Sequence, residues 1–157
     1  MIDIISQLLI SCFFKKSLNR SFQEIFAKNY KISGTIAEFG AYQGSSKNFI
    51  NYMKKSRNIK IIFCDKAKRN SKLSQQEDLE KRISIRKNSC NSIILFNVLE
   101  HIYNSENALK EIHRCLKKGG KLIGSVPFIH RIHHAPEDYN RYTPQYLNKI
   151  LKKNKYK

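Results

Sequence analysis

A short loop that contains two glycines follows an apolar segment and begins with an acid. It runs from Glu38 to Gly44, and its two glycines are Gly40 and Gly44. Glycine lets a backbone turn sharply and approach a ligand closely. Asp65 lies 21 residues after Gly44, at the end of the next apolar segment, where a carboxylate can accept hydrogen bonds from both hydroxyls of a ribose. The spacing predicts a nucleotide-like ligand at two strand ends; the alternative is a tight turn with a solvated acid.

The spacing of the glycines also distinguishes between possible nucleotide cofactors. A dinucleotide-binding fingerprint requires glycine at the first, third and sixth positions. Counted from Gly40, the third and sixth positions hold Tyr42 and Ser45. The loop therefore disfavours NAD.

Three histidines gather late in the chain at His130, His133 and His134. A neutral imidazole suits removal of a proton near pH 7, so we predict His133 as the base for a hydroxyl acceptor, with His101 as the second candidate. A structural role for His133 in the loop around Pro136 is the alternative. The sequence places no carboxylate or cysteine ligand beside these histidines, and we expect no metal.

Other polar and aromatic side chains have two readings each. Glu100 is either a functional acid or a carboxylate bonded to nearby backbone amides. Tyr139, Tyr142 and Tyr146 follow the last predicted strand. They either pack beneath a loop that covers the site or stack on a sugar or other ring of a substrate.

The cysteines and the N-terminal segment indicate in which cellular compartment the protein is expected. Cys12, Cys64, Cys90 and Cys115 are far apart, so they form no zinc or dithiol pair and are expected to be reduced, buried thiols of a cytoplasmic protein. Residues 2–14 are apolar but too short to cross a bilayer. We expect an amphipathic helix that packs on the domain; a membrane-surface anchor is the alternative.

The chain is strongly basic, with 30 Lys and Arg against 12 Asp and Glu and a formal charge of +18. Such a charge suits an acidic partner such as nucleic acid. The basic residues are scattered, however, and 22 lysines and 14 asparagines point to a general compositional bias. Nucleic acid is therefore an unfavoured partner.

Short apolar strands alternate with helical periods after about residue 30, which predicts a parallel sheet covered by helices. With 157 residues the chain suits one domain. We expect N-terminal helices in 1–30 and an α/β domain in 31–157. The strands are predicted at 35–39, 59–64, 92–98 and 122–126, with a short edge strand at 82–86. The helices are predicted at 45–55, at 106–118 with Gly119 as the stop, and from Thr143 to about Lys152.

Several motifs together resemble class I S-adenosylmethionine-dependent methyltransferases of the type 11 group. The Glu38–Gly44 loop is similar to their acidic-x-Gly-x-Gly-x-Gly loop, with Tyr42 at the middle glycine. The segments 97–102, 116–122 and 126–128 resemble those after the fourth strand, before the fifth strand and after it. The later matching residues are His133, Pro136, Asp138, Arg141, Tyr142 and Thr143. The resemblance covers residues 36–151 and points to a bacterial branch concerned with sugars or cell surfaces.

The resemblance implies a Rossmann-like three-layer α/β/α sandwich with a mostly parallel sheet in the order 3-2-1-4-5. We expect the sheet to lack the last two strands of the family. Residues 122–126 would then form an uncovered edge strand, which favours self-association or a fragment of a longer product.

The same resemblance implies roles for single residues. Asp65 would hold the ribose of S-adenosylmethionine, and Asp78 would reach its adenine amine. The remaining cofactor-binding positions would be Glu38, Gly40, Gly44, Asn97 and Leu99, with Asn97 using its backbone. The implied activity is methyl transfer to a small molecule or a glycan or cell-surface precursor. A degenerate, non-catalytic domain is the alternative, and a nucleic-acid methyltransferase is less favoured.

Overall fold

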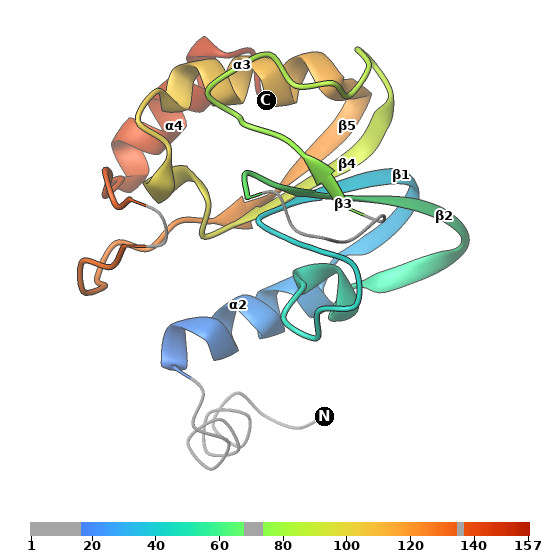
Figure 1. The fold of residues 1–157 in the computed structure, drawn as a ribbon, viewed down its shortest axis with the longest axis horizontal. Coiled ribbons are helices and arrows are strands. Elements are labelled where there is room, and N and C mark those ends of the chain that lie inside the picture. The colour runs from blue at the N-terminus through green and yellow to red at the C-terminus, as the bar shows by residue number, and fades with distance from the viewer. Residues whose placement is uncertain (1–16, 68–73, 135–136) are drawn as a thin grey trace.

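Five parallel strands form one sheet at the centre of the computed structural model (Figure 1). The structure describes residues 17–67, 74–134 and 137–157. The strand order β3-β2-β1-β4-β5 is the predicted one. The strands are β1 (Lys31–Phe39), β2 (Lys54–Asp65), β3 (Ser74–Gln76), β4 (Cys90–Phe96) and β5 (Leu116–Ser125).

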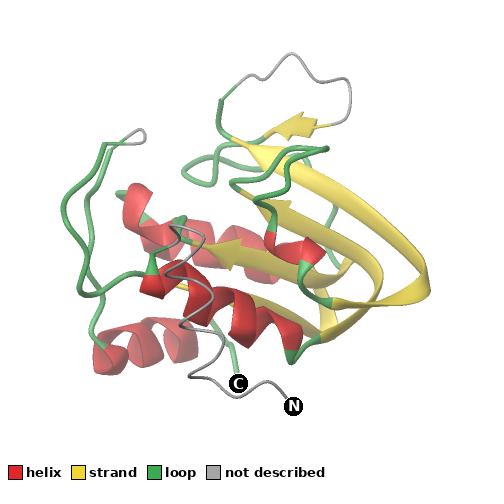
Figure 2. Cartoon of the chain, turned by 90° about the horizontal axis from the view of Figure 1, so that it is seen from below, coloured by secondary structure: helices red, strands yellow, loops and turns green. Residues whose placement is uncertain are grey.

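Helices cover both faces of this sheet and give three layers (Figures 1 and 2). One face packs against α3 (Ser105–Cys115) and α4 (Pro144–Lys153). The other packs against α2 (Leu18–Lys28) and the 3-10 turn η1 (Phe49–Asn51). A second 3-10 turn, η2 (Leu99–His101), follows β4. The expected Rossmann-like α/β/α sandwich is confirmed.

Alternation along β4 builds the two cores. Ile93 and Leu95 belong to the core beneath α3 and α4, whereas Ile94 and Phe96 belong to the core beneath α2 and η1. Successive side chains of a strand point to opposite faces, so a strand buried on both sides must be apolar throughout. This explains why the segment is a continuous apolar run.

The predicted strands exist, but backbone pairing moves their ends. β1 begins at Lys31 and β2 at Lys54, several residues before the apolar segments, because these two residues pair with each other. Backbone hydrogen bonds do not require apolar side chains, so polar residues extend both strands.

The helix predicted at 45–55 is wrong. The segment holds only the three-residue turn η1, and β2 has already begun at Lys54. The carboxylate of Glu38 accepts hydrogen bonds from the amides of Phe49 and Ile50, and the Lys54 amide donates to the Tyr30 carbonyl. These long-range bonds replace the bonds that a helix would make.

The helix predicted at 106–118 ends earlier, at Cys115. Leu116 is extended and already pairs with Cys90 of β4. Between the paired positions Cys90–Leu116 and Ser92–Lys121, one residue of β4 lies opposite four residues of β5, and the resulting bulge holds Gly119 at a φ of 74°. Strand pairing therefore ends the helix before Gly119, where the sequence predicted its stop.

Two further expectations have opposite outcomes. Residues 82–86 form no strand; the edge strand is β3, and the Arg114 guanidinium donates to the carbonyls of Ile83 and Ile85 and fixes the loop. The helix after Thr143 is confirmed, because the Thr143 hydroxyl accepts a hydrogen bond from the amide of Tyr146. Cys12 and the helix predicted in residues 2–14 lie outside the described residues.

A tight approach between β4 and β5 predicts a sensitive position. A Cβ atom at Gly124 would lie 2.0 Å from the Leu95 carbonyl oxygen. We expect Gly124→Ala to lower the free energy of unfolding by about 2–3 kcal/mol, because neighbouring backbone must move apart. Urea denaturation measures the change. The control Lys121→Ala, at an exposed position on the same strand, should stay within about 0.5 kcal/mol; equal effects would contradict the clash.

Candidate functional site

The glycine loop lies directly beyond the end of β1. Gly40 has a φ of 69° and Gly44 a φ of 82°, in the left-handed region that favours glycine. The Ala41 amide donates to the Cys64 carbonyl, so the loop is held against β2. A Cβ atom at Gly40 would lie 3.1 Å from Val98 Cγ2, whereas one at Gly44 would meet nothing within 4 Å. The loop therefore packs closely against Val98 at Gly40, whereas the space beside Gly44 is empty.

Two acids stand beside this loop at the ends of neighbouring strands. Asp65 is the last residue of β2, and its backbone carbonyl accepts from the Glu77 amide just after β3. Asp78 therefore follows at the adjacent strand end, with Oδ1 accepting from the Glu80 amide at 3.0 Å. The Gln43 amide donates to Ser74 Oγ at 3.2 Å and ties the loop to β3. The structure thus brings together the Gly40–Gly44 loop, Asp65 and Asp78.

Glu38 is placed differently from its expected role. Glu38 is 2% exposed, and its carboxylate accepts hydrogen bonds from the amides of Phe49 at 2.6 Å and Ile50 at 3.2 Å. Burial raises the pKa of Glu38 to about 7, and the two amides oppose that shift. The carboxylate organises η1 beneath the loop, and its contact with a cofactor stays a prediction.

Asn97 and Leu99 follow β4. Asn97 has a φ of 53°, and its side-chain amide exchanges two hydrogen bonds with Gln23 of α2, at 2.6 and 3.0 Å. Gln23 also donates to Ser125 Oγ at 2.8 Å. Nothing in the sequence distinguishes Gln23, because a polar residue on an amphipathic helix is expected to face solvent. Leu99 is 4% exposed and packs in the core beneath α3 and α4.

The two predicted base candidates meet in space. The ring centroids of His101 and His133 are 5.0 Å apart. Glu100 lies beside them, with its Oε1 3.8 Å from His101 Nε2. One ligand-type atom from each of these three residues lies within 4.8 Å of the others. We call Glu100, His101 and His133 the Glu-His-His cluster.

The loop after β5 positions this cluster through an ion pair. The Asp138 carboxylate accepts from the Arg141 guanidinium and from the His133 amide, and its Oδ2 lies 3.2 Å from His133 Nδ1. Hydrogen bonds from Arg141 hold the pKa of Asp138 well below its usual range. His101 Nδ1 bonds to the Glu137 carbonyl. The His101 ring is therefore anchored at Nδ1, whereas His133 is held through its backbone amide and its Nδ1 makes no hydrogen bond.

Glu100 is the least satisfied polar side chain of the described residues. Its side chain is fully buried, and neither carboxylate oxygen has a hydrogen-bond partner. The reading that Glu100 bonds nearby backbone amides is wrong; only its backbone carbonyl accepts amides, from Tyr139 and Asn140. Burial raises the pKa of Glu100 to about 7 and the charge of Asp138 adds to the rise, whereas the backbone amide of Glu100 itself and the charge of Arg141 oppose it.

A cavity of about 220 Å³ opens beside the cluster. Its lining includes Arg20, Gln23, Asn97, Glu100, His130 and His133. These residues come from α2, from the loop after β4 and from the loop after β5. Polar groups that can act on a proton or a cation therefore converge at the carboxyl ends of the central strands.

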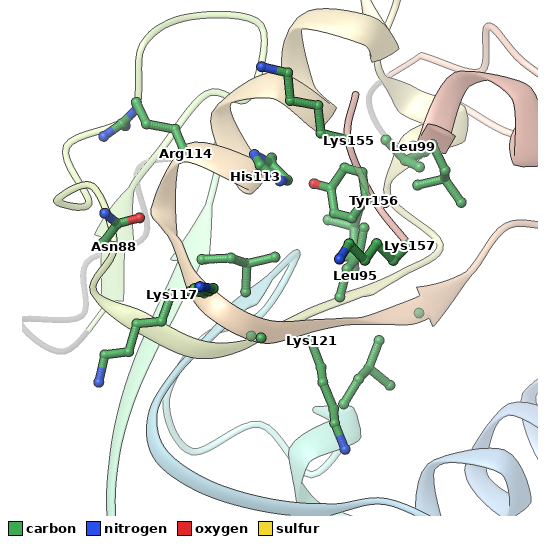
Figure 3. A pocket seen from close by; sticks show the side chains of 18 of the residues that line it. Asn88, Leu95, Leu99, His113, Arg114, Lys117, Lys121, Lys155, Tyr156 and Lys157 are labelled. Atoms are coloured by element: carbon green, nitrogen blue, oxygen red, sulfur yellow. The ribbon is translucent and has the colours of Figure 1, made fainter. Parts of the chain in front are cut away.

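A larger cavity of about 1120 Å³ runs along the open edge of β5 (Figure 3). Among the described residues, β5 pairs only with β4. Lysines surround the cavity, including Lys117, Lys121, Lys155 and Lys157. Glu100, His130 and His133 line the smaller cavity instead, so the larger volume does not mark the place where these titratable side chains meet. The predicted uncovered edge is present; its role in self-association stays a prediction.

The three tyrosines that follow β5 differ in their burial and contacts. Tyr142 is 4% exposed, and its hydroxyl donates to the Leu99 carbonyl at 3.1 Å. Its ring stacks on that of Tyr146 with centroids 6.1 Å apart. Tyr139 is half exposed and packs edge-on against Tyr103. Packing explains Tyr142, while Tyr139 and Tyr146 keep surface for a ligand.

The cysteines within the described residues are buried free thiols at Cys64, Cys90 and Cys115. Burial raises the pKa of the Cys115 thiol to about 11, which disfavours the reactive thiolate. None of the helices in residues 17–67, 74–134 and 137–157 has the length and apolar character needed to cross a membrane.

Comparison with known proteins agrees with this geometry. Residues 47–124 match a family model described as a methyltransferase domain. The fold is similar to that of a Bacillus halodurans C-125 protein described provisionally as a methyltransferase, with a TM-score of 0.56 and 14% sequence identity. The match covers 88% of this chain and 66% of the other. No curated protein matches the chain.

The parallel sheet in this order, with a glycine loop and acids at its strand ends, gives a Rossmann-like α/β domain. The matching family model indicates that this domain is similar to methyltransferase domains.

The raised pKa of Glu100 predicts how stability varies with pH. An unfolded Glu ionises near its model value of 4.5 and the folded one near 7, so the native state binds the extra proton between these values. Stability falls as pH rises through this window, by about 3 kcal/mol at about 1.4 kcal/mol per pKa unit. We expect Glu100→Gln to abolish this part of the fall, measured by urea denaturation at several pH values in metal-free buffer.

The matched control is Glu137→Gln, since Glu137 lies in the neighbouring loop with a side chain that is 58% exposed. It should keep the wild-type pH profile. A Glu100→Gln profile parallel to that of the wild type would show that Glu100 ionises normally in the folded state.

Proposed function

We propose that this chain transfers the methyl group of S-adenosylmethionine to a hydroxyl of a small molecule or of a glycan or cell-surface precursor. The observation that carries the proposal is the convergence of the Gly40–Gly44 loop, Asp65 and Asp78 at adjacent strand ends. The match to a methyltransferase domain supports the reaction class. The hydroxyl acceptor rests on the histidine pair.

The residues at the strand ends fit this cofactor. The loop backbone passes Gly44 with open space where a side chain would stand, so a ligand can approach it closely. Asp65, beside the loop, offers a carboxylate for the two ribose hydroxyls, and Asp78 offers one for the adenine amine. The methionyl end would then face Asn97 and the smaller cavity.

Bound there, S-adenosylmethionine supplies an electrophilic methyl group on a sulfonium, whose sulfur leaves as a neutral thioether. The protein has to align the acceptor oxygen with that methyl group and to exclude water, and positioning supplies most of the rate. His133 would take the hydroxyl proton as the oxygen attacks. Asp138 would hold its ring and stabilise the imidazolium that forms, since their atoms are 3.2 Å apart.

Two rival functions have their own supporting observations. Tyr42 at the middle glycine position and the amide-bonded carboxylate of Glu38 favour a degenerate domain that binds the cofactor poorly or not at all. The charge of +18 favours a nucleic-acid substrate, but the small cavity beside the histidines contains one arginine and no lysine. We therefore rank the small-molecule or glycan acceptor first.

The role proposed for Asp65 predicts how much this residue contributes to cofactor binding. Two hydrogen bonds to ribose contribute about 1–3 kcal/mol together, so Asp65→Ala should weaken binding of S-adenosylmethionine by about ten- to a hundredfold. Calorimetric titration measures the dissociation constants. Glu137→Ala, on the loop after β5, should bind as the wild type does. A wild type that binds no cofactor would support the degenerate domain, and equal affinity in Asp65→Ala would remove Asp65 from the site.

The role proposed for His133 predicts that its substitution lowers turnover without weakening cofactor binding. Once an acceptor is found by incubating labelled cofactor with fractionated lysate, His133→Gln should lower kcat by about a hundredfold and leave cofactor affinity nearly unchanged. His134→Gln is the control, since that side chain is 76% exposed on the same loop. Full activity of His133→Gln would return His133 to a structural role.

A further inference from the structure

The Glu-His-His cluster has a composition and a geometry that proton transfer alone does not explain. It joins two imidazoles and one carboxylate whose ligand-type atoms all lie within 4.8 Å of one another. Ligands around a tetrahedral zinc ion lie about 3.3 Å apart when each bond is about 2.0–2.1 Å. Small side-chain rotations would therefore bring the three groups to one ion.

The carboxylate of Glu100 points to a missing cation. It is fully buried, and both oxygens lack a hydrogen-bond partner. A buried carboxylate without partners costs several kcal/mol, and proteins normally satisfy it with a donor or a metal. Arg141, whose positive charge acts on Glu100, is already bonded to Asp138. Two buried carboxylates thus face one guanidinium.

His101 is oriented as metal ligands commonly are, and His133 has an unbonded ring nitrogen. His101 Nδ1 bonds to the Glu137 carbonyl, and a proton on this atom leaves the lone pair on Nε2, which is the usual arrangement of a ligating histidine with its outer partner. His133 Nδ1 is buried without a hydrogen-bond partner, 3.2 Å from the Asp138 carboxylate. His101 Nε2 is the ring atom that lies 3.8 Å from Glu100 Oε1.

We propose that Glu100, His101 and His133 bind a divalent transition-metal ion of the zinc type. Two imidazoles and one carboxylate suit Zn²⁺, Fe²⁺ or Mn²⁺ rather than Ca²⁺ or Mg²⁺. Glu100 and His133 line the cavity of about 220 Å³, so the remaining coordination positions face open space. Three protein ligands and an open position are typical of catalytic metal sites rather than structural ones.

The sequence predicted no metal because it showed no carboxylate beside the late histidines. Glu100 stands 33 residues before His133, and only the fold joins them. With a metal bound, His133 is a ligand and takes no proton. A hydroxyl on the metal would lose its proton more readily, because the cation lowers its pKa. The metal site goes beyond the proposed function, since metal binding can be measured without cofactor or acceptor.

The test is a titration of the full chain, freed of metal by a chelator, with Zn²⁺ against a chromophoric competitor. We expect one Zn²⁺ per chain, bound in the micromolar range or tighter. Losing an outer partner of a ligating histidine weakens metal binding by about 10–100-fold, so losing a ligand should cost at least as much. Glu100→Gln and His101→Gln should each weaken binding at least tenfold.

His134→Gln is the matched control, since it removes an exposed imidazole next to His133 and should bind Zn²⁺ as the wild type does. Thermal unfolding with and without Zn²⁺ provides a second readout and reports whether each variant folds. The wild type and His134→Gln should melt higher with Zn²⁺, and Glu100→Gln should not. A wild type without one bound Zn²⁺, or a folded Glu100→Gln with unchanged affinity, would overturn the proposal.

Discussion

Parallel pairing of β1 with both β2 and β4 is the constraint on which the rest of the structure depends. Parallel strands must all end at the same edge of the sheet, and the connections must return through helices on its faces. The glycine loop after β1, Asp65 after β2 and the Asn97 turn after β4 are therefore neighbours, although long segments separate them in sequence. A central strand buried on both faces gives this edge a rigid base.

Buried carboxylates divide the site into two parts with different electrostatics. Glu38 and Glu100 are both excluded from water, and burial raises the pKa of each to about 7. Glu38 is satisfied by two backbone amides and shapes the turn below the glycine loop. Glu100 has no such partners. The same desolvation thus supports structure at the first acid and leaves the second one in need of a proton or a cation.

The loop after β5 positions one side of the Glu-His-His cluster. Asp138 and Arg141 form an ion pair at the base of this loop, and Asp138 also receives the His133 amide. Tyr142 fastens the following segment to the Leu99 carbonyl. Through these contacts, residues that follow the last strand reach back to η2, where Glu100 and His101 stand. The side of the site that holds the Glu-His-His cluster is therefore made by two loops held together by buried polar bonds.

The sequence by itself determined the order of elements, the parallel sheet and the strand-end positions of Asp65 and the glycine loop, because these depend on local periodicity and on residue types with few conformational options. It failed at residues 45–55 and at 116–118, where helical signals are local but strand pairing and the Glu38 carboxylate act over long distances. Only the tertiary structure brought Glu100 and His101 to His133 and Gln23 to Asn97. Such contacts join separate elements, and no spacing along a single element encodes them.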